Sequence, residues 1–168
     1  MPKIVEVEKS TIINVPVERL WKVSADEFEH IDRWDGNVKT SHPSSDAIVN
    51  APVEGRVCNL YGGGRTVERF VELDDSKYTF VYEITEGLPG FVISARNTWI
   101  HEAIAGNKTQ LTMRVVMRVK GLLGRIMQCP MKLQMGKVLS NAQEELKHYI
   151  ETGQPHPRKR KKMKRAKK

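Results

Sequence analysis

The sequence has only two cysteines, no long apolar run and none of the short motifs that mark common catalytic sites. Cys58 and Cys129 form no Cys-x-x-Cys pair and no framework, which favours a reducing compartment over a secreted, disulfide-linked scaffold. No stretch approaches the roughly 18 apolar residues that a membrane span requires. The first ten residues, MPKIVEVEKS, also lack the apolar core of a signal peptide. We therefore expect a soluble, cytoplasmic protein.

Metal-ligand and nucleophile motifs are absent as well. The five histidines show no His-Glu-x-x-His or other ligand spacing, so we expect no metal site and no cofactor. No Gly-x-Ser-x-Gly elbow supports a serine nucleophile. The glycine run from Tyr61 to Arg65 has neither the lysine nor the following helix of a phosphate loop. It predicts a hairpin turn instead.

The net charge of +8 comes from one end of the chain. Nine of the 28 basic residues lie between Arg158 and Lys168, so residues 1–157 hold 19 basic and 20 acidic residues, a net charge of −1. Residues 154–168 have no apolar period and a high density of like charge. They predict a disordered basic tail that follows a single domain of residues 1–153.

The most regular pattern in the chain is a long amphipathic helix that begins at Met131. Its apolar residues recur at steps of three and four, whereas Lys132, Glu145 and Lys147 lie on other faces. The apolar positions are Met131, Met135, Val138, Leu139, Ala142, Leu146, Tyr149 and Ile150. A single apolar stripe indicates that this helix packs against one surface.

Strands and two short helices account for the rest of the domain. Residues 3–14 predict a first strand, and residues 17–35 predict two short helices. Turn signals such as Pro43–Asp46 and Gly87–Gly90 divide the next segment, which ends at Val119, into six antiparallel strands. The acidic cluster of the second short helix is expected to be its solvated face. It consists of Asp26, Glu27, Glu29, Asp32 and Asp35.

Several local sequences occur in an order that points to a known superfamily. They are Ser10–Trp21 (STIINVPVERLW), Trp34 after an acidic helix, Gly55-Arg56 at a strand start, Glu68, Tyr82–Pro89 (YEITEGLP) and a closing helix that ends near Glu151. In this order they resemble the START-like proteins, also called SRPBCC, which include polyketide cyclases, lipid-transfer domains and relatives of the birch-pollen allergen. The resemblance implies an α+β helix-grip fold, in which a seven-stranded curved antiparallel sheet wraps around the long C-terminal helix. It also implies a deep apolar cavity between sheet and helix.

A packing argument predicts the same cavity. One helix has a single apolar stripe, whereas seven curved strands have many inward residues, so a void remains unless bulky side chains fill it. We expect this cavity to bind or transport a small hydrophobic ligand such as a lipid, a quinone or a polyketide-like aromatic. The residues predicted to bind it are Trp34, Phe80, Tyr82, Asn97, Trp99, Met113, Met117, Met135 and Leu139. Flexible methionines suit a wall that adapts to its guest, although they also fill ordinary cores.

Catalysis in such a pocket, as in a polyketide cyclase or dehydrase, is the alternative to a carrier or sensor. It needs an inward acid, base or donor. On the strand around Glu68, the alternation makes Val67, Val71 and Leu73 the interior set, so Glu68 is expected to point to water. An inward Glu68 with a raised pKa would be the first candidate general acid. On a later strand, either Arg96 or Asn97 must face inward.

The basic tail gives a third hypothesis, an RNA- or ribosome-associated factor. Its cations suit an anionic membrane surface or nucleic-acid phosphates, and the alternative is a solubilising extension. The tail has no aromatic residue to stack on bases, so nucleic-acid binding would be independent of sequence. The residues expected to contact an anionic surface are Arg158, Lys159, Arg160, Lys161, Lys162, Lys164 and Arg165.

Overall fold

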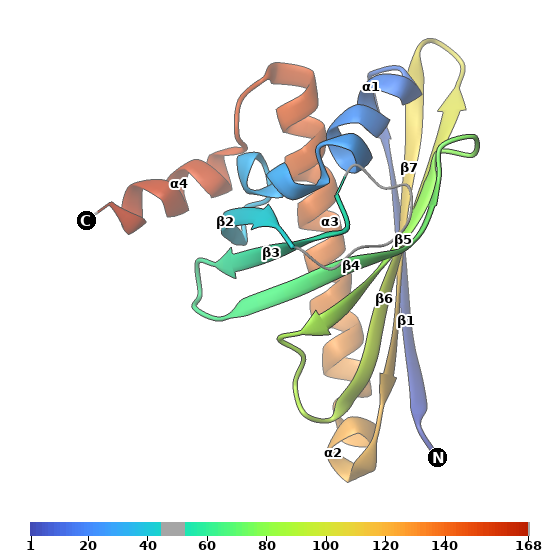
Figure 1. Ribbon diagram of the computed structural model, residues 1–168, viewed down its shortest axis with the longest axis vertical. Helices are drawn as coiled ribbons and strands as arrows, with labels where there is room; N and C mark the ends of the chain where they lie inside the picture. The colour runs from blue at the N-terminus through green and yellow to red at the C-terminus, as the bar shows by residue number, and fades with distance from the viewer. Residues whose placement is uncertain (45–52, 168) are drawn as a thin grey trace.

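The computed structural model describes residues 1–44 and 53–167, in which a curved sheet lies against one long helix (Figure 1). The strands are β1 (Lys3–Ile13), β2 (Val38–Pro43), β3 (Gly55–Leu60), β4 (Arg65–Asp74), β5 (Thr79–Glu86), β6 (Val92–Ile104) and β7 (Lys108–Val119). The helices are α1 (Val17–Trp21), the π-helical η1 (Lys22–Asp26), the 3-10 helix η2 (Phe28–Arg33), α2 (Gly121–Ile126), α3 (Gln128–Thr152) and α4 (Pro157–Ala166). The predicted helix-grip α+β fold is confirmed. The turn predicted at Pro43–Asp46 lies partly outside the described residues.

All seven strands are antiparallel neighbours in the order β1-β7-β6-β5-β4-β3-β2. The first strand pairs with the last along its whole length, from Lys3 opposite Val119 to Ile13 opposite Thr109. The chain must therefore cross from one edge of the sheet to the other between β1 and β2. Helices α1, η1 and η2 make that crossing, and the remaining strands follow one another as a meander (Figure 1).

Helix α3 has 25 residues and lies along the sheet. It begins at Gln128, three residues before the predicted start, because Pro130 sits in the first turn, where its missing N–H costs no helical hydrogen bond. It ends at Thr152, and the next residue, Gly153, has a φ of 72° and forms the left-handed cap that glycine adopts most readily. Within the described part of the chain, no helix is both long and apolar enough to cross a membrane.

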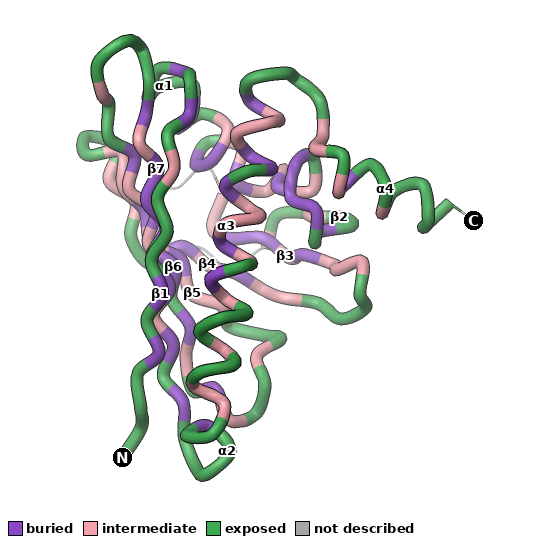
Figure 2. Tube along the Cα trace, turned by 180° about the vertical axis from the view of Figure 1, so that it is seen from behind, coloured by how far each residue is buried: buried purple, intermediate pink, exposed green. Residues whose placement is uncertain are grey.

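The core lies between the sheet and the upper half of α3, where Figure 2 shows buried residues facing one another. Its inner wall includes the predicted face of β7, since Met113 is 0% and Met117 is 3% exposed. Phe80 is fully buried and stacks on Trp99, with 5.2 Å between ring centroids. The lower part of α3 and all but Gly124 of α2 are much more exposed (Figure 2).

The prediction for the faces of β4 is wrong at Glu68 and Val71. Glu68 and Phe70 are buried, whereas Val71 is 37% exposed. The pairing of β4 with β5 shifts at two irregularities, between Val67 and Glu68 and between Phe70 and Glu72. Leu73 packs against the core as predicted. The shift between Phe70 and Glu72 moves the alternation by one residue, so Phe70 and Glu68 share the inner face with Leu73, and Val71 does not.

The basic tail is also not disordered over residues 157–166, where the structure has helix α4. Pro157 occupies the first helical position, where its fixed φ is favourable. The ring of His156 caps the helix, because its Nδ1 atom accepts a hydrogen bond from the Arg158 backbone nitrogen at 3.2 Å. Helix α4 also packs against the domain. Its contacts with the domain hold its like charges close to one another, and the sequence pattern does not reveal those contacts.

Candidate ligand-binding cavity

A cavity of about 540 Å³ lies between the sheet and α3. Most of its lining is apolar and comes from β5, β6 and β7 on one side and from α3 on the other. The apolar residues that line it include Ile84, Ala95, Met113, Val115, Met117, Met135, Val138, Leu139 and Ala142. Small-molecule pockets in proteins commonly measure about 300–1,000 Å³, so this space suits a ligand of modest size.

Seven of the nine residues predicted to bind a ligand line this cavity. They are Tyr82, Asn97, Trp99, Met113, Met117, Met135 and Leu139. The other two, Trp34 and Phe80, pack in the aromatic core behind Trp99, with ring centroids 6.3 Å and 5.2 Å from it. The seven are therefore placed to touch a guest, and their role in binding stays a prediction.

Two lining residues of β6, Asn97 and Trp99, each contain a buried polar atom without a partner in the described part of the chain. Asn97 Oδ1 and Trp99 Nε1 are buried and have no hydrogen-bond partner among the described residues. Asn97 Nδ2 donates to the hydroxyl of Tyr82 at 2.8 Å, which fixes the amide. Burial and the nearby Glu68 charge raise the pKa of Tyr82, so its hydroxyl stays neutral at pH 7. Of the two neighbours Arg96 and Asn97, the one that faces inward is Asn97.

A buried ion pair forms a second polar region of the lining. Arg56 Nε donates to Glu68 Oε2 at 2.7 Å, and the Arg56 guanidinium lies 3.7 Å from the centre of the Phe28 ring. Burial disfavours the charge of Arg56, but the Glu68 carboxylate raises its pKa, so the guanidinium stays charged. The prediction that Glu68 points to water is wrong, because Arg56 gives this carboxylate a partner inside the protein.

Asp35 is a third polar group of the lining, and its prediction as part of a solvated face is also wrong. It is 9% exposed, and its Oδ1 atom accepts a hydrogen bond from the backbone nitrogen of Asn37 at 2.7 Å. Burial raises the pKa of this carboxyl group. Asp26, at the other end of the acidic cluster, is exposed as predicted.

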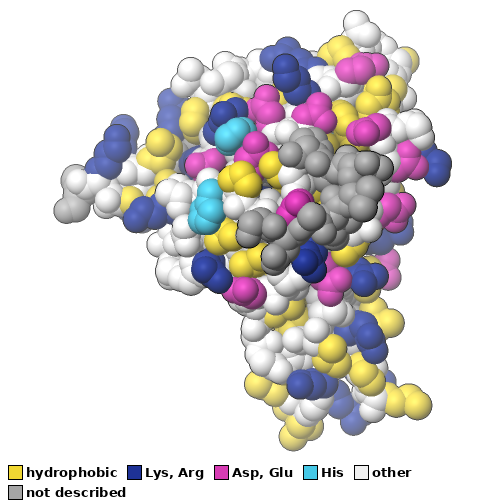
Figure 3. All heavy atoms as spheres, in the orientation of Figure 1, with side chains coloured by type: hydrophobic (Ala, Val, Ile, Leu, Met, Phe, Trp, Pro, Cys, Tyr) yellow, Lys and Arg dark blue, Asp and Glu magenta, His cyan; other side chains and the backbone are white. Residues whose placement is uncertain are grey.

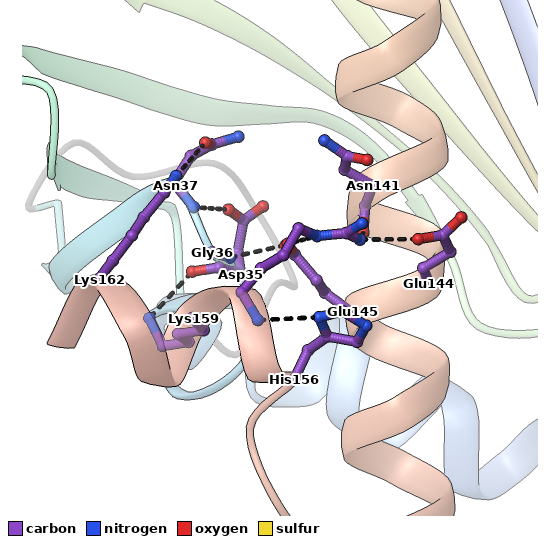
Figure 4. Close-up of polar contacts among 10 residues, drawn as sticks. Asp35, Gly36, Asn37, Asn141, Glu144, Glu145, His156, Lys159 and Lys162 are labelled. Atoms are coloured by element: carbon purple, nitrogen blue, oxygen red, sulfur yellow. Dashed lines mark hydrogen bonds and ion pairs between the residues drawn. The ribbon is translucent and has the colours of Figure 1, made fainter. Parts of the chain in front are cut away.

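Helix α4 packs beside α3 and the segment before β2, as Figure 4 shows, and both α4 and that segment contribute residues to the cavity lining. Lys159 is 2% exposed, and its Nζ atom donates to the backbone oxygens of Asp35 at 2.9 Å and Val38 at 2.8 Å. Burial lowers the pKa of this lysine. Lys162 lines the cavity, and its Nζ atom donates to Asn37 Oδ1 at 3.0 Å.

Arg158 ties α4 to α3. Its Nε atom donates to Glu145 Oε1 at 2.9 Å, and its Nη2 atom donates to Glu144 Oε2 at 2.8 Å. Glu145 is 3% exposed, so the prediction that it lies on a solvated face of the helix is wrong. Lys159 is buried, which contradicts its prediction as a surface-binding residue, whereas Arg158 is partly exposed and its role at a surface stays a prediction. Four of the others, Arg160, Lys161, Lys164 and Arg165, are exposed.

Ser24, His101 and Cys58 belong to residue types that often act in catalysis, but they are buried away from the cavity. Ser24 Oγ lies 2.9 Å from Nε2 of His101, whose Nδ1 atom donates to the Tyr78 backbone oxygen at 2.8 Å. Burial lowers the pKa of His101 to about 4, so the ring is neutral at pH 7. Burial also raises the pKa of Cys58 to about 11, so its thiol stays protonated. None of these residues lines the cavity.

The family model for polyketide cyclase / dehydrase and lipid transport matches residues 5–151. The chain belongs to this family. The matched segment runs from within β1 to the last turn of α3, and it ends before α4. No curated protein matches the chain.

Solved structures share the fold at low sequence identity. The protein XoxI of Bacillus cereus is 14% identical, with a TM-score of 0.73, and the match covers 90% of this chain and 99% of that one. A START superfamily protein of Mycobacterium smegmatis is 13% identical, with a TM-score of 0.71 and coverage of 88% and 97%. A norcoclaurine synthase point mutant of Thalictrum flavum, in complex with a transition-state analogue, is 12% identical, with a TM-score of 0.70 and coverage of 89% and 96%. These likenesses concern the fold alone.

Proposed function

We propose that this member of the family is a carrier or sensor that encloses a small hydrophobic molecule carrying a polar group. The observation that carries the proposal is the cavity of about 540 Å³, apolar over most of its wall, whose lining residues Asn97 and Trp99 have the unpartnered atoms Oδ1 and Nε1. A buried polar atom without a partner costs about 1–3 kcal/mol. A ligand that supplies the missing partners recovers that free energy when it binds.

The two atoms also define the chemistry of the ligand. Asn97 Oδ1 accepts a hydrogen bond, so it matches a hydroxyl or amine hydrogen, whereas Trp99 Nε1 donates and matches a carbonyl or hydroxyl oxygen. A polyketide-like aromatic or a reduced quinone with neighbouring oxygens satisfies both atoms. A lipid tail without polar atoms satisfies neither and fills only the apolar part of the cavity.

Isothermal calorimetry with hydroxylated aromatics, quinols and lipids tests this proposal. Asn97→Leu keeps the approximate size of the side chain and removes the acceptor, so we expect about tenfold weaker binding of an oxygenated ligand. The matched control is Thr98→Val, the next residue on β6, which does not line the cavity. Equal affinity of both variants and the wild type for every ligand that binds would contradict the assigned polar contact.

An enzyme of the cyclase or dehydrase type is the second candidate function. It is supported by the family description and by the burial of Glu68 in the cavity lining. Glu68 is the ion-pair partner of Arg56, so proton transfer by this carboxylate requires the pair to rearrange around the substrate. Glu68→Gln is expected to abolish turnover of a cyclisable substrate while its binding persists, whereas Glu72→Gln, on the same strand, leaves turnover intact. Turnover that survives Glu68→Gln removes Glu68 from this role.

For the exposed cations of α4, contact with an anionic membrane or with nucleic acid stays a prediction. Deletion of the whole tail is a poor test, because Lys159 and Arg158 hold the rim of the cavity. A variant with glutamine at four exposed positions preserves those contacts and removes the free charges. The substitutions are Arg160→Gln, Lys161→Gln, Lys164→Gln and Arg165→Gln. Unchanged binding to polynucleotides and anionic vesicles over a salt series excludes α4 from both roles.

A further inference from the structure

Helix α2 presents a group of exposed apolar side chains. Leu122 is 74% exposed, Leu123 55% and Ile126 65%. Ile126 follows the two leucines by four and three residues, so all three lie on neighbouring positions of one short helix. Single exposed leucines are common, but a contiguous apolar group on a protein surface marks an interaction site. We call these three residues, together with Lys120 and Arg125, the α2 tip.

The chain around the α2 tip carries charge of one sign. Residues 103–143 contain no aspartate or glutamate. Their basic residues are Lys108, Arg114, Arg118, Lys120, Arg125, Lys132 and Lys137. Arg114 pairs with Glu6 and Glu8 of β1, but no ion pair neutralises Lys120 or Arg125 within the described residues. Lys108 lies at the other end of β7, opposite Ile104, and Lys132 and Lys137 line a groove with Glu6 and Glu8. The cations at the tip itself are therefore Lys120 and Arg125.

Figure 3 shows the α2 end of the molecule as a mixture of hydrophobic and basic side chains, at the place where Figure 1 shows α2. On the face shown, the acidic side chains lie higher up, around the other end of the molecule. Apolar side chains with a basic surround are the composition of segments that lie in the interface of an anionic bilayer.

A second hollow lies between this end and the cavity. It measures about 360 Å³ and is lined by Met117, Met127, Pro130, Met131, Gln134 and Met135. Met117, Gln134 and Met135 also line the main cavity, so the two spaces adjoin. Met127 directly follows α2. Flexible thioethers thus occupy the space between the cavity and the α2 tip, where they can move aside for an apolar molecule.

We propose that the α2 tip docks the protein on an anionic lipid bilayer, with its apolar side chains at the interface and its cations among the head groups. The docking is inferred from exposure and charge alone. The methionine-lined hollow then faces the bilayer and serves as an entrance to the cavity, and this second part rests on the proposed function. Pairing of two copies through this surface is disfavoured, because it brings two sets of unneutralised cations together.

Vesicle co-sedimentation of the full chain tests the docking. We expect binding to phosphatidylcholine vesicles that contain phosphatidylserine, weaker binding at high salt and little binding to phosphatidylcholine alone. The variant Leu122→Gln, Leu123→Gln, Ile126→Gln keeps every charge and replaces only exposed side chains, so its unfolding midpoint should match that of the wild type. Its affinity for the anionic vesicles should fall at least about tenfold.

The matched control is the four-glutamine variant of α4 described above, which removes exposed cations far from the α2 tip. It should retain most of the vesicle binding. The proposal is overturned if the wild type does not bind anionic vesicles, if the triple variant binds as well as the wild type, or if the α4 variant alone abolishes binding. A wild-type dimer in analytical ultracentrifugation that the triple variant dissociates would assign the tip to self-association instead.

A separate readout distinguishes the docking from the proposed function. The triple variant should bind a dissolved ligand as tightly as the wild type, because the tip does not line the main cavity. It should extract the same ligand from anionic vesicles more slowly. Absence of any ligand binding by the wild type defeats the proposed function and the entrance, but vesicle binding that depends on the α2 tip still establishes the docking.

Discussion

The carboxylate of Glu145 accepts a hydrogen bond from the backbone nitrogen of Gly36 at 2.7 Å, although the two residues are 109 positions apart. The other oxygen of the same carboxylate accepts from Arg158 at 2.9 Å. One buried side chain on α3 therefore joins the segment before β2 to α4. Both of those segments contribute to the cavity rim, through Asn37 and Lys162.

Gly36→Ala is expected to destabilise the protein, because a Cβ atom at this position would lie 2.6 Å from Glu145 Oε1. The carboxylate must move and loses its hydrogen bond geometry, at a cost of about 1–3 kcal/mol in the free energy of unfolding. Urea denaturation measures this change. Gly90→Ala is the control, since no atom lies within 4 Å of its added Cβ. Equal losses in the two variants would show that Glu145 does not constrain Gly36.

Glu145→Gln is expected to loosen α4, because the buried carboxylate is replaced by a neutral amide beside Arg158. The side chain of Arg158 is 38% exposed, so we expect a modest loss of about 1–2 kcal/mol together with faster amide hydrogen exchange over residues 157–166. Glu144→Gln removes the other carboxylate that binds Arg158, but this side chain is 60% exposed. Hydrogen exchange that accelerates equally in both variants contradicts a special role for Glu145.

His101 should make the stability of the protein depend on pH. Burial lowers its pKa from an ordinary value of 6.5 to about 4, so the unfolded chain binds this proton more readily than the folded one. The stability from the neutral ring is therefore complete above pH 6.5 and is lost as the pH falls toward 4, by about 3 kcal/mol in total. Urea denaturation at several pH values, compared with His101→Gln, isolates this contribution. An identical pH dependence for both proteins counts against it.

The elements with regular patterns could be predicted from the sequence. On β7 the alternation holds except at Val116, and on α3 the apolar stripe repeats at helical spacing, so Met117 and Leu139 were correctly assigned to the interior. Met117 and Leu139 lie on opposite walls of the cavity, because the sheet forms one wall and α3 forms the other. The seven predicted ligand-binding residues that line the cavity all come from β5, β6, β7 and α3, where strand and helix periods hold.

The errors share one physical cause, which is dependence on partners far away in the sequence. Glu68 is buried because Arg56 neutralises it, and the bulges that turn it inward leave no mark in the alternation of β4. Glu145 and Lys159 are buried because α4 folds back against α3 and the segment before β2. A run of cations without an apolar period predicts disorder. The carboxylate and carbonyl groups that bind these cations lie in other segments of the chain, and the run itself gives no sign of them.

The central claim is that the space between sheet and α3 holds a guest, and native mass spectrometry of protein purified without detergent tests it most directly. The wild type should carry a small molecule, or bind one from a panel of quinols, hydroxylated aromatics and lipids. Ala142→Phe, which adds a ring to the cavity lining, should carry none, whereas Ser140→Phe, in the groove beside β1, should carry the same molecule as the wild type. A wild-type protein that is always empty and binds no member of the panel, or an Ala142→Phe variant that binds as the wild type does, would contradict the account.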